Sequence, residues 1–379
     1  MGFSDMRIKR LREYMVEHDL AALYVRDTSN IEWLTAFDDV FDDERAHAML
    51  VDEARALLHT DSRYVTACER AAHGTAVEVN ADAVGHAKIA RSFWDASCAR
   101  AVDRAGAIGR LGIEDSMALS EFRALEKEFS CEGGSSDLPF AETDGVVVNL
   151  RAVKDADEIH RMRAAQVITD AAFAHIIAFM KPGMTEREVQ LELEDFMVRN
   201  GASGLAFSSI VATGANGASP HAIPGSTVLE AGQCVVLDFG ARALGYCSDM
   251  TRTVFLGAPE GKMLEAWLTM RRANEEVEAM IRPGVTGAEA HEHAECVLAE
   301  GGFGGLMGHG LGHGVGIDIH EQPVLNPRNF KPLAAGNVVT VEPGIYIPGE
   351  FGMRLEDFGV VTDDGFDVFT ESTHELVVL

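Results

Sequence analysis

One pattern occurs twice in the chain, about a hundred residues apart, and it restricts the fold more than any other feature. The segment KPGMTERE, which starts at Lys181, resembles RPGVTGAE, which starts at Arg282. Further along each copy, LEAGQCVVLD from Leu229 aligns with LAAGNVVTVE from Leu333. Two motifs repeated in the same order at nearly the same spacing predict a duplicated structural unit.

Each copy has the signals of two consecutive helices. Ala156–Phe179 and Leu264–Ile281 have helical periodicity, and each is followed by a Pro-Gly pair that stops a helix. A threonine with a glutamate three residues later, at Thr185 and again at Thr286, then has the spacing of a capping box. We therefore expect a pseudo-twofold arrangement of two halves, each with two helices and a strand pair.

The strand pair of the first copy carries two aspartates. Val235–Phe255 contains two apolar runs around a glycine-bounded turn, with Asp238 in one run and Asp249 in the other. A hairpin with a medium-length loop over Gly240–Gly245 would place these carboxylates nearly opposite each other. Like charges so placed are destabilising unless something positive lies between them.

The strand pair of the second copy carries two glutamates. Asp238 aligns with Glu342, and Glu342 and Glu356 have Gly349 at their midpoint, beside a turn. If the pseudo-twofold brings both hairpins together, four carboxylates converge on one small volume. Their repulsion would force protonation or unfold the site. Two divalent cations would balance the charge.

Histidines accompany both acid pairs. The glycine-rich segment Gly308–His320 contains His309, His313 and His320, and its glycines allow close backbone approach. This favours a ligand role over a flexible loop with solvated histidines. His221 precedes the first hairpin as His320 precedes the second. Alone, His221 could equally be a surface histidine.

This donor set predicts a metal centre and a hydrolytic reaction. Four carboxylates with one imidazole suit manganese and can accept cobalt, iron or zinc. Paired metals about 3.5–4 Å apart can share a carboxylate and generate a bridging hydroxide at neutral pH. The remaining histidines could donate hydrogen bonds to the developing oxyanion.

Residues 1–130 predict a separate α/β domain. Met6–Val16 and Ala87–Val102 have helical spacing, whereas Ala21–Val25 and the pair Ala48–Val51 and Ala56–His59 are strand-like. This region has no glycine-rich phosphate loop and no convergent catalytic set. We expect the CEGGSS sequence at 131–136 to belong to a linker over 131–155, followed by a catalytic domain over 156–379.

Bulk properties limit the partners and the compartment. The chain has 379 residues, 47% of them apolar, and a formal net charge of −28, so we expect neither nucleic acid nor an anionic membrane as a partner. Its six cysteines are scattered without a C-x-x-C pair, and no apolar run approaches the ~20 residues that span a bilayer. These features predict a cytoplasmic protein with reduced thiols.

Several of these segments together resemble a known family. The chain is similar to the pita-bread metallopeptidases, and within them to the prolidase and aminopeptidase P branch, in six motifs: Asp238-Phe239-Gly240, Ser248-Asp249-Met250-Thr251-Arg252-Thr253, Gly312-His313-Gly314-Val315-Gly316, His320-Glu321, Val341-Glu342-Pro343-Gly344-Ile345-Tyr346 and Arg354-Leu355-Glu356-Asp357. The first ~130 residues resemble the creatinase-type N-terminal domain. The resemblance therefore covers the whole chain, and it implies an α/β N-terminal domain followed by an α+β pita-bread fold.

The resemblance also implies a role for each site residue. It gives as metal ligands Asp238, Asp249, His313, Glu342 and Glu356. The glutamate matching Glu342 also handles the proton of the nucleophilic water. The equivalents of His221 and His320 steady the substrate and the tetrahedral intermediate, and His309 and Arg354 match positions near the proline side of the substrate.

The expected activity is cleavage of a Xaa-Pro bond in a small peptide by a dinuclear-metal exopeptidase. A dipeptidase (prolidase) is slightly favoured over an aminopeptidase P because the chain is compact. A metal-dependent hydrolase of a small non-peptide amide remains an alternative, and a non-catalytic binding protein is a weaker one because all five ligand positions are filled. Relatives commonly form dimers, so we expect a homodimer.

Overall fold

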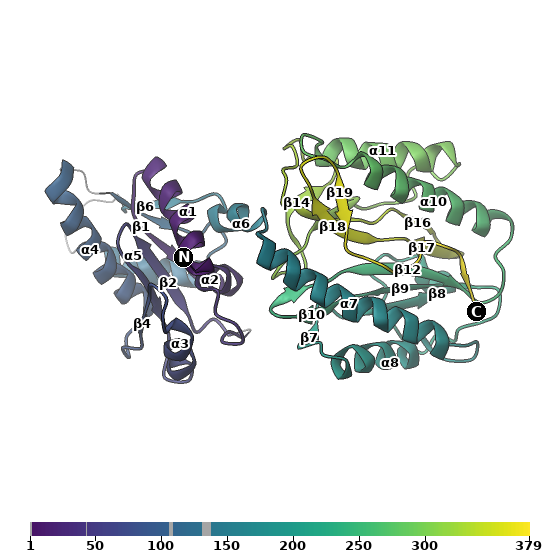
Figure 1. Cartoon of the computed structure of the whole chain (residues 1–379), viewed down its shortest axis with the longest axis horizontal. Coiled ribbons are helices and arrows are strands. Elements are labelled where there is room, and N and C mark those ends of the chain that lie inside the picture. The colour runs from purple at the N-terminus through teal and green to yellow at the C-terminus, as the bar shows by residue number, and fades with distance from the viewer. Residues whose placement is uncertain (1, 43, 106–108, 131–137) are drawn as a thin grey trace. The chain divides into compact units, whose positions relative to one another are not determined.

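The chain forms two compact units. A computed structural model describes residues 2–42, 44–105, 109–130 and 138–379 (Figure 1). The units are Met1–Arg151 and Ala152–Leu379. Residues 131–136, the CEGGSS sequence at the start of the expected linker, lie outside the described residues. Residues 140–151, which we also assigned to the linker, instead belong to the first unit, because β6 (Phe140–Glu142) adds a parallel strand beside β5 (Arg110–Ile113).

The first unit is an α/β structure around one six-stranded mixed sheet in the order β4-β3-β2-β1-β5-β6. Strands β1 (Leu20–Val25), β2 (Ala48–Asp52), β3 (Ala56–His59) and β4 (Val77–Asn80) join β5 and β6 in this sheet. The helices are α1 (Phe3–Glu17), α2 (Thr28–Thr35), α3 (Val65–Ala72), α4 (His86–Ala105), α5 (Leu119–Phe129) and α6 (Val146–Arg151). Every residue of β2 and β3 is buried, which explains why both strands are apolar up to their last residues, Asp52 and His59.

The second unit has its strands between two layers of helices. Figure 1 shows α7 (Ala156–Phe179) and α8 (Glu186–Arg199) on one side, and α10 (Gly261–Met280) and α11 (Gly287–Glu300) on the other. One sheet has the order β20-β12-β9-β8, a second has the order β14-β13-β15-β18-β19, and β16 pairs with β17. Its strands are β8 (Ile210–Thr213), β9 (Cys234–Phe239), β12 (Met250–Phe255), β13 (Gly312–Gly314), β14 (Glu321–Leu325), β15 (Val338–Val341), β16 (Gly344–Ile347), β17 (Phe351–Arg354), β18 (Asp357–Val361), β19 (Phe366–Val368) and β20 (Val377–Val378). A small third sheet contains β7 (Gly204–Leu205), β10 (Ala241–Ala243) and β11 (Tyr246–Cys247), and α9 (Gly214–Gly217) is a single turn.

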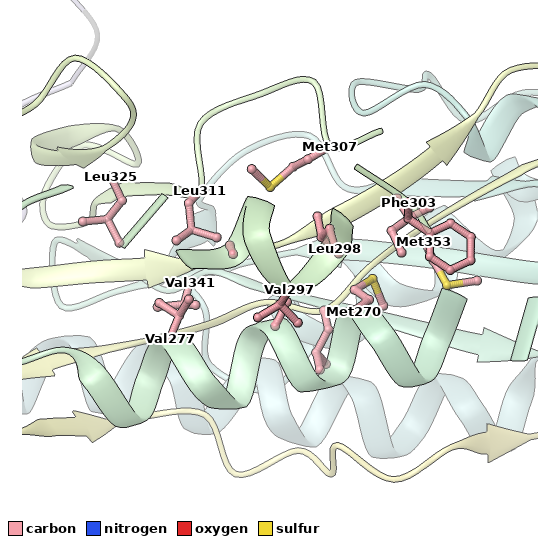
Figure 2. Close-up of a cluster of buried hydrophobic side chains, with 14 of the residues drawn as sticks. Met270, Val277, Val297, Leu298, Phe303, Met307, Leu311, Leu325, Val341 and Met353 are labelled. Carbon is pink, nitrogen blue, oxygen red and sulfur yellow. The ribbon is translucent and has the colours of Figure 1, made fainter. Parts of the chain in front are cut away.

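Two apolar cores support these strands. The core under α10 and α11 includes Met270, Val297, Leu298 and Val341, all at most 3% exposed (Figure 2). The core under α7 and α8 contains apolar side chains from one face of β9 and β12, among them Leu237. Each helix pair therefore seals one side of the strands that carry the acidic residues, which gives these strands a rigid base.

The predicted duplication appears as repeated contacts. Both predicted capping boxes form, at Thr185 with Glu188 and at Thr286 with Glu289. Each capping threonine also makes an isolated β-bridge to a residue shortly before a strand that leads to the acidic residues. Thr185 pairs with Val228, before β9, and Thr286 pairs with Pro332, before β15.

A histidine–glutamate pair joins the two helices of each half, with the partners exchanged. His175 on α7 contacts Glu192 on α8 at 2.7 Å, and His293 on α11 contacts Glu276 on α10 at 3.0 Å. The exchange places a histidine where the other half has a glutamate, which preserves the interaction and is consistent with two copies that diverged from one unit.

The first acid-bearing hairpin differs from our expectation in its register. Its turn has two residues, Leu244 and Gly245, both with positive φ (51° and 80°), so the loop is shorter than Gly240–Gly245. Asp238 consequently lies opposite Thr251, so the prediction that Asp238 and Asp249 lie nearly opposite each other is wrong by two residues. Because alternate residues share a face, the same register makes Asp249 a diagonal neighbour of Asp238.

The second acid-bearing hairpin has the expected register. Val341 pairs with Asp357 and Gly344 pairs with Arg354, so Glu342 and Glu356 face each other between the two pairs. Both pairings are centred on Gly349, which has a positive φ of 77° in the turn.

In the described part of the chain, no helix combines the length and the apolar character needed to cross a membrane.

Candidate metal centre

A backbone hydrogen bond joins the two hairpins next to the acidic residues. The Glu356 amide donates to the Thr251 carbonyl at 3.1 Å, which forms an isolated bridge between the hairpins. The Thr251 hydroxyl also donates to Glu356 Oε2 at 2.6 Å. Thr251 stands opposite Asp238, so this bridge brings an acid of the second hairpin to the acid face of the first.

Three of the four predicted carboxylates, Asp238, Asp249 and Glu356, are buried in the wall of one cavity, and Glu342 is half-buried beside them. Asp249 and Glu356 are 3% and 2% exposed, and Asp238 is 6% exposed. Burial raises the pKa of Asp249 and Glu356 well above the usual values, and the neighbouring carboxylates raise it further. Burial likewise raises the pKa of Asp238 and Glu342. Four crowded carboxylates are therefore unfavourable as anions unless a cation balances their charge.

His313 turns a bare ring nitrogen toward these carboxylates. Its Nδ1 lies 3.0 Å from the Gly314 carbonyl oxygen, which can only accept, so Nδ1 carries the proton. Burial lowers the pKa of His313, so the ring is neutral and Nε2 has a lone pair. That Nε2 lies 3.5 Å from Asp249 Oδ2 and 3.4 Å from Glu342 Oε1. Three electron-pair donors facing one another need a cation between them.

The donor atoms fit a divalent metal. Ligand atoms of Asp249, His313 and Glu356 lie within 4.8 Å of one another. Asp238 Oδ1 is buried and has no hydrogen-bond partner among the described residues, which is rare for a carboxylate oxygen unless an ion binds it. Four carboxylates and one neutral imidazole form a donor set for a hard or borderline ion.

Arg354, one of the predicted substrate-binding residues, directly contacts the carboxylates. Its Nη2 contacts Asp238 Oδ2, and its Nε donates to the Thr251 hydroxyl at 2.9 Å. The guanidinium is buried, and its Nε is 3.9 Å from Glu356 Oε2. Arg354 therefore lowers the local negative charge as well as lining the cavity.

The other predicted residues line the same cavity. It has a volume of about 750 Å³, and its wall includes His221, His309 and His320 together with the four carboxylates and His313. The rings of His313 and His320 meet edge to face with centroids 4.4 Å apart. Every predicted site residue thus reaches one cavity in the second unit.

The sequence patterns did not identify several residues that support this site. Thr340 contacts both His313 and Glu342, accepting from the His313 amide at 3.0 Å and donating to Glu342 Oε1 at 3.2 Å. Tyr346 accepts from Arg354 at 3.0 Å, and its hydroxyl lies 3.2 Å from His309 Nε2. Thr340 and Tyr346 are close to Glu342 in the sequence, but only the fold shows which neighbours they contact.

A second group of possible metal ligands is formed by Glu278, Asp357 and His374. Arg252 already fills this group with a positive charge, because its Nη2 donates to Asp357 Oδ1 at 2.7 Å and both side chains are buried. Among the described residues, the group around Asp249 is therefore the better candidate for a metal.

Comparisons with known proteins agree with this geometry. Residues 160–363 match metallopeptidase family M24, and residues 7–153 match the creatinase/prolidase N-terminal domain. The chain belongs to the M24 metallopeptidases and has the N-terminal domain of the creatinase and prolidase group.

Its relatives include enzymes with both predicted peptidase activities. A Xaa-Pro dipeptidase of Pyrococcus horikoshii is 35% identical over 71% of this chain and 75% of the relative. The structure of a Xaa-Pro dipeptidase from Bacillus anthracis has a TM-score of 0.86 at 35% identity and covers 99% of this chain and 100% of that one. The X-Pro aminopeptidase of Thermotoga maritima has a TM-score of 0.81 at 32% identity, covering 98% and 100%.

Proposed function

We propose that the protein is a Xaa-Pro dipeptidase that depends on two divalent metal ions. The observation that carries the proposal is the convergence of Asp238, Asp249, His313, Glu342 and Glu356 on one cavity, with a bare imidazole nitrogen facing carboxylate oxygens. The similarity to Xaa-Pro dipeptidases over the whole chain supports the substrate class.

The five converging residues are the proposed metal ligands, and manganese is the preferred ion. Oxygen-rich sites with one imidazole suit manganese, while cobalt, iron and zinc are alternatives. Two such ions would acidify a bound water and polarise the scissile carbonyl.

The protein's own residues would handle the proton and the substrate. Glu342 accepts the proton of the attacking water, because its carboxylate faces the cavity beside His313. His221 and His320, on the cavity wall, hold the substrate and donate to the developing oxyanion. His309 and Arg354, which share Tyr346 as a neighbour, bind on the proline side.

The resemblance to the family also supports two broader proposals. We infer a homodimer in the cytoplasm, with a small peptide as the only substrate partner. The net charge of −28 disfavours nucleic acid and anionic membranes.

The experiment compares hydrolysis of a Xaa-Pro dipeptide and a Xaa-Pro-Yaa tripeptide by the manganese-loaded enzyme, with a Xaa-Ala dipeptide as the control. We expect the dipeptide to be cleaved fastest, and a chelator to abolish the reaction. Faster cleavage of the tripeptide would favour an aminopeptidase P, which the similarity to the Thermotoga enzyme supports as the second candidate. Inert Xaa-Pro substrates alongside turnover of a non-peptide amide would overturn the peptidase proposal.

A further inference from the structure

The loop that carries His320 is held by a buried ion pair. This loop, residues 315–320, joins β13 to β14, and Gly314 pairs with Glu321 across its base. Glu321 Oε2 accepts from Lys154 Nζ at 3.0 Å, and the two side chains are only 4% and 1% exposed. Removing either partner of a buried ion pair leaves an uncompensated buried charge, which strongly destabilises the fold. The two side chains are therefore held together in a fixed position.

The Glu321 carboxylate also fixes the loop itself. Its Oε1 accepts from the Asp318 amide at 3.0 Å, which ties the middle of the loop to its end. A side chain at Gly316 would collide with this carboxylate at about 2.5 Å, so the loop wraps closely around it. On the other side, the Cys247 amide donates to the Gly316 carbonyl at 2.8 Å. His320 is the residue directly before Glu321, so a shift of the carboxylate would move the histidine.

Lys154 is itself fixed to the segment that leads to Glu342. Its amide donates to the Gly336 carbonyl at 2.8 Å, and Val153 forms a β-bridge with Asn337. The Asn337 side chain donates to the Ala152 carbonyl at 2.8 Å. These residues immediately precede β15, so the ammonium group is positioned by the same strand that delivers Glu342.

We propose that Lys154 is a positioning residue that acts through Glu321 to hold His320 against the metal centre. Lys154 does not touch the cavity, whereas His320 lines it and packs on His313. The inference rests on the proposed function, because it assigns a role to His320 in substrate turnover.

The kinetic test uses Lys154→Met, which keeps the aliphatic stem and removes the charge. We expect kcat for a Xaa-Pro dipeptide to fall at least tenfold at saturating manganese, with the bound manganese per chain unchanged. In the His320→Ala background, the same substitution should have little further effect, since the residue through which it acts is already gone. An equal loss in both backgrounds would overturn the proposal and indicate a general structural role.

Two further variants control for charge and folding. Lys262→Met makes the same chemical change at an exposed pair with Glu350, 3.0 Å away, and should leave kcat unchanged. The double variant Lys154→Met/Glu321→Gln removes both charges and should regain part of the lost kcat, because no unpaired buried charge remains. Failure of the double variant to recover any activity over the single one would contradict the charge argument.

A spectroscopic arm separates this inference from the proposed function. In NMR spectra of the zinc-loaded protein, the ring resonances of His320 should shift in the Lys154→Met variant and keep their wild-type positions in the Lys262→Met variant. Unchanged His320 resonances would overturn the positioning role whatever the substrate. Shifted resonances in a protein that cleaves no Xaa-Pro peptide would keep the positioning role and reject the substrate assignment.

Discussion

The His313 ring shows at the scale of single atoms why this site needs a cation. Its Nδ1 proton is committed to the Gly314 carbonyl, so its Nε2 lone pair points at carboxylate oxygens of Asp249 and Glu342. Such an arrangement is repulsive in an empty site and attractive around a metal ion. The donor directions therefore support a metal role more strongly than the presence of five suitable residue types.

Thr251 should tune the metal affinity without being a ligand. Its hydroxyl donates to the Glu356 carboxylate and accepts from Arg354 Nε, and the Thr251 side chain is fully buried. Residues that orient metal ligands typically account for about 10- to 100-fold in affinity. We expect Thr251→Val to weaken manganese binding by about that factor in a titration. Thr143→Val, at a buried threonine of the first unit that donates to the Ile113 carbonyl, is the matched control and should bind manganese normally.

Glu278 should make the stability of the protein depend on pH. Burial and the nearby Asp357 carboxylate raise the pKa of Glu278 from 4.5 to about 8. An acid whose pKa is raised in the folded state binds its proton more tightly there than in the unfolded chain. Its contribution to the free energy of unfolding is complete below the unfolded pKa of 4.5 and is lost as the pH rises through about 8. In the manganese-loaded protein, Glu278→Gln should therefore flatten the decrease in melting temperature between pH 5 and pH 9, measured by thermal unfolding. A variant with the same slope as the wild type would show that Glu278 is ionised at neutral pH.

At the scale of elements, the repeat predicted the site better than any single hairpin did. The capping boxes and the Glu342–Glu356 pair could be located from the sequence because they depend on local spacing. The Asp238–Asp249 pairing could not, since a two-residue turn at Leu244 and Gly245 shifted the register. The partners of Tyr346 were also hidden, because Arg354 and His309 reach it through the tertiary fold.

In the first unit, too, local sequence patterns located some strands and helices and missed others. The pattern located α1, β1 and the β2–β3 hairpin, whose apolar residues are contiguous. It missed α2 and α3, which have eight residues each and are shorter than the window over which helical periodicity is recognised. It also treated β6 as linker, because three residues gain strand structure only by pairing with β5.

The two capping boxes should contribute equally if the halves are true copies. Each threonine accepts from a helix amide, at 3.2 Å for Thr185 and 3.1 Å for Thr286. Removing such a cap costs about 1 kcal/mol. We expect Thr185→Ala and Thr286→Ala each to lower the free energy of unfolding by about that amount, measured by urea denaturation. Thr185→Ser and Thr286→Ser retain the hydroxyl and should be nearly neutral; a loss in only one half would argue against equivalent caps.

At the scale of the whole molecule, metal binding should stabilise one unit selectively. All proposed ligands lie in Ala152–Leu379, so manganese adds stability only to that unit. A ligand at a hundredfold its Kd stabilises the native state by about 2.7 kcal/mol. In calorimetry, we expect manganese to raise the midpoint temperature of one unfolding transition and to leave the midpoint temperature of the Met1–Arg151 transition unchanged. Asp238→Ala should lose the shift, whereas equal shifts of both transitions would place metal binding elsewhere.

The acid pairs of two duplicated halves together create a charge that neither half would hold alone. The central claim is that this shared charge binds two ions, and the most direct measurement is the number of manganese ions bound per chain. After dialysis against excess manganese, the wild-type protein should retain two ions and hydrolyse a Xaa-Pro dipeptide, while Asp238→Ala should retain fewer than two and be inactive. A wild-type protein that binds no manganese, or an Asp238→Ala variant with two ions and near-normal activity, would contradict the account.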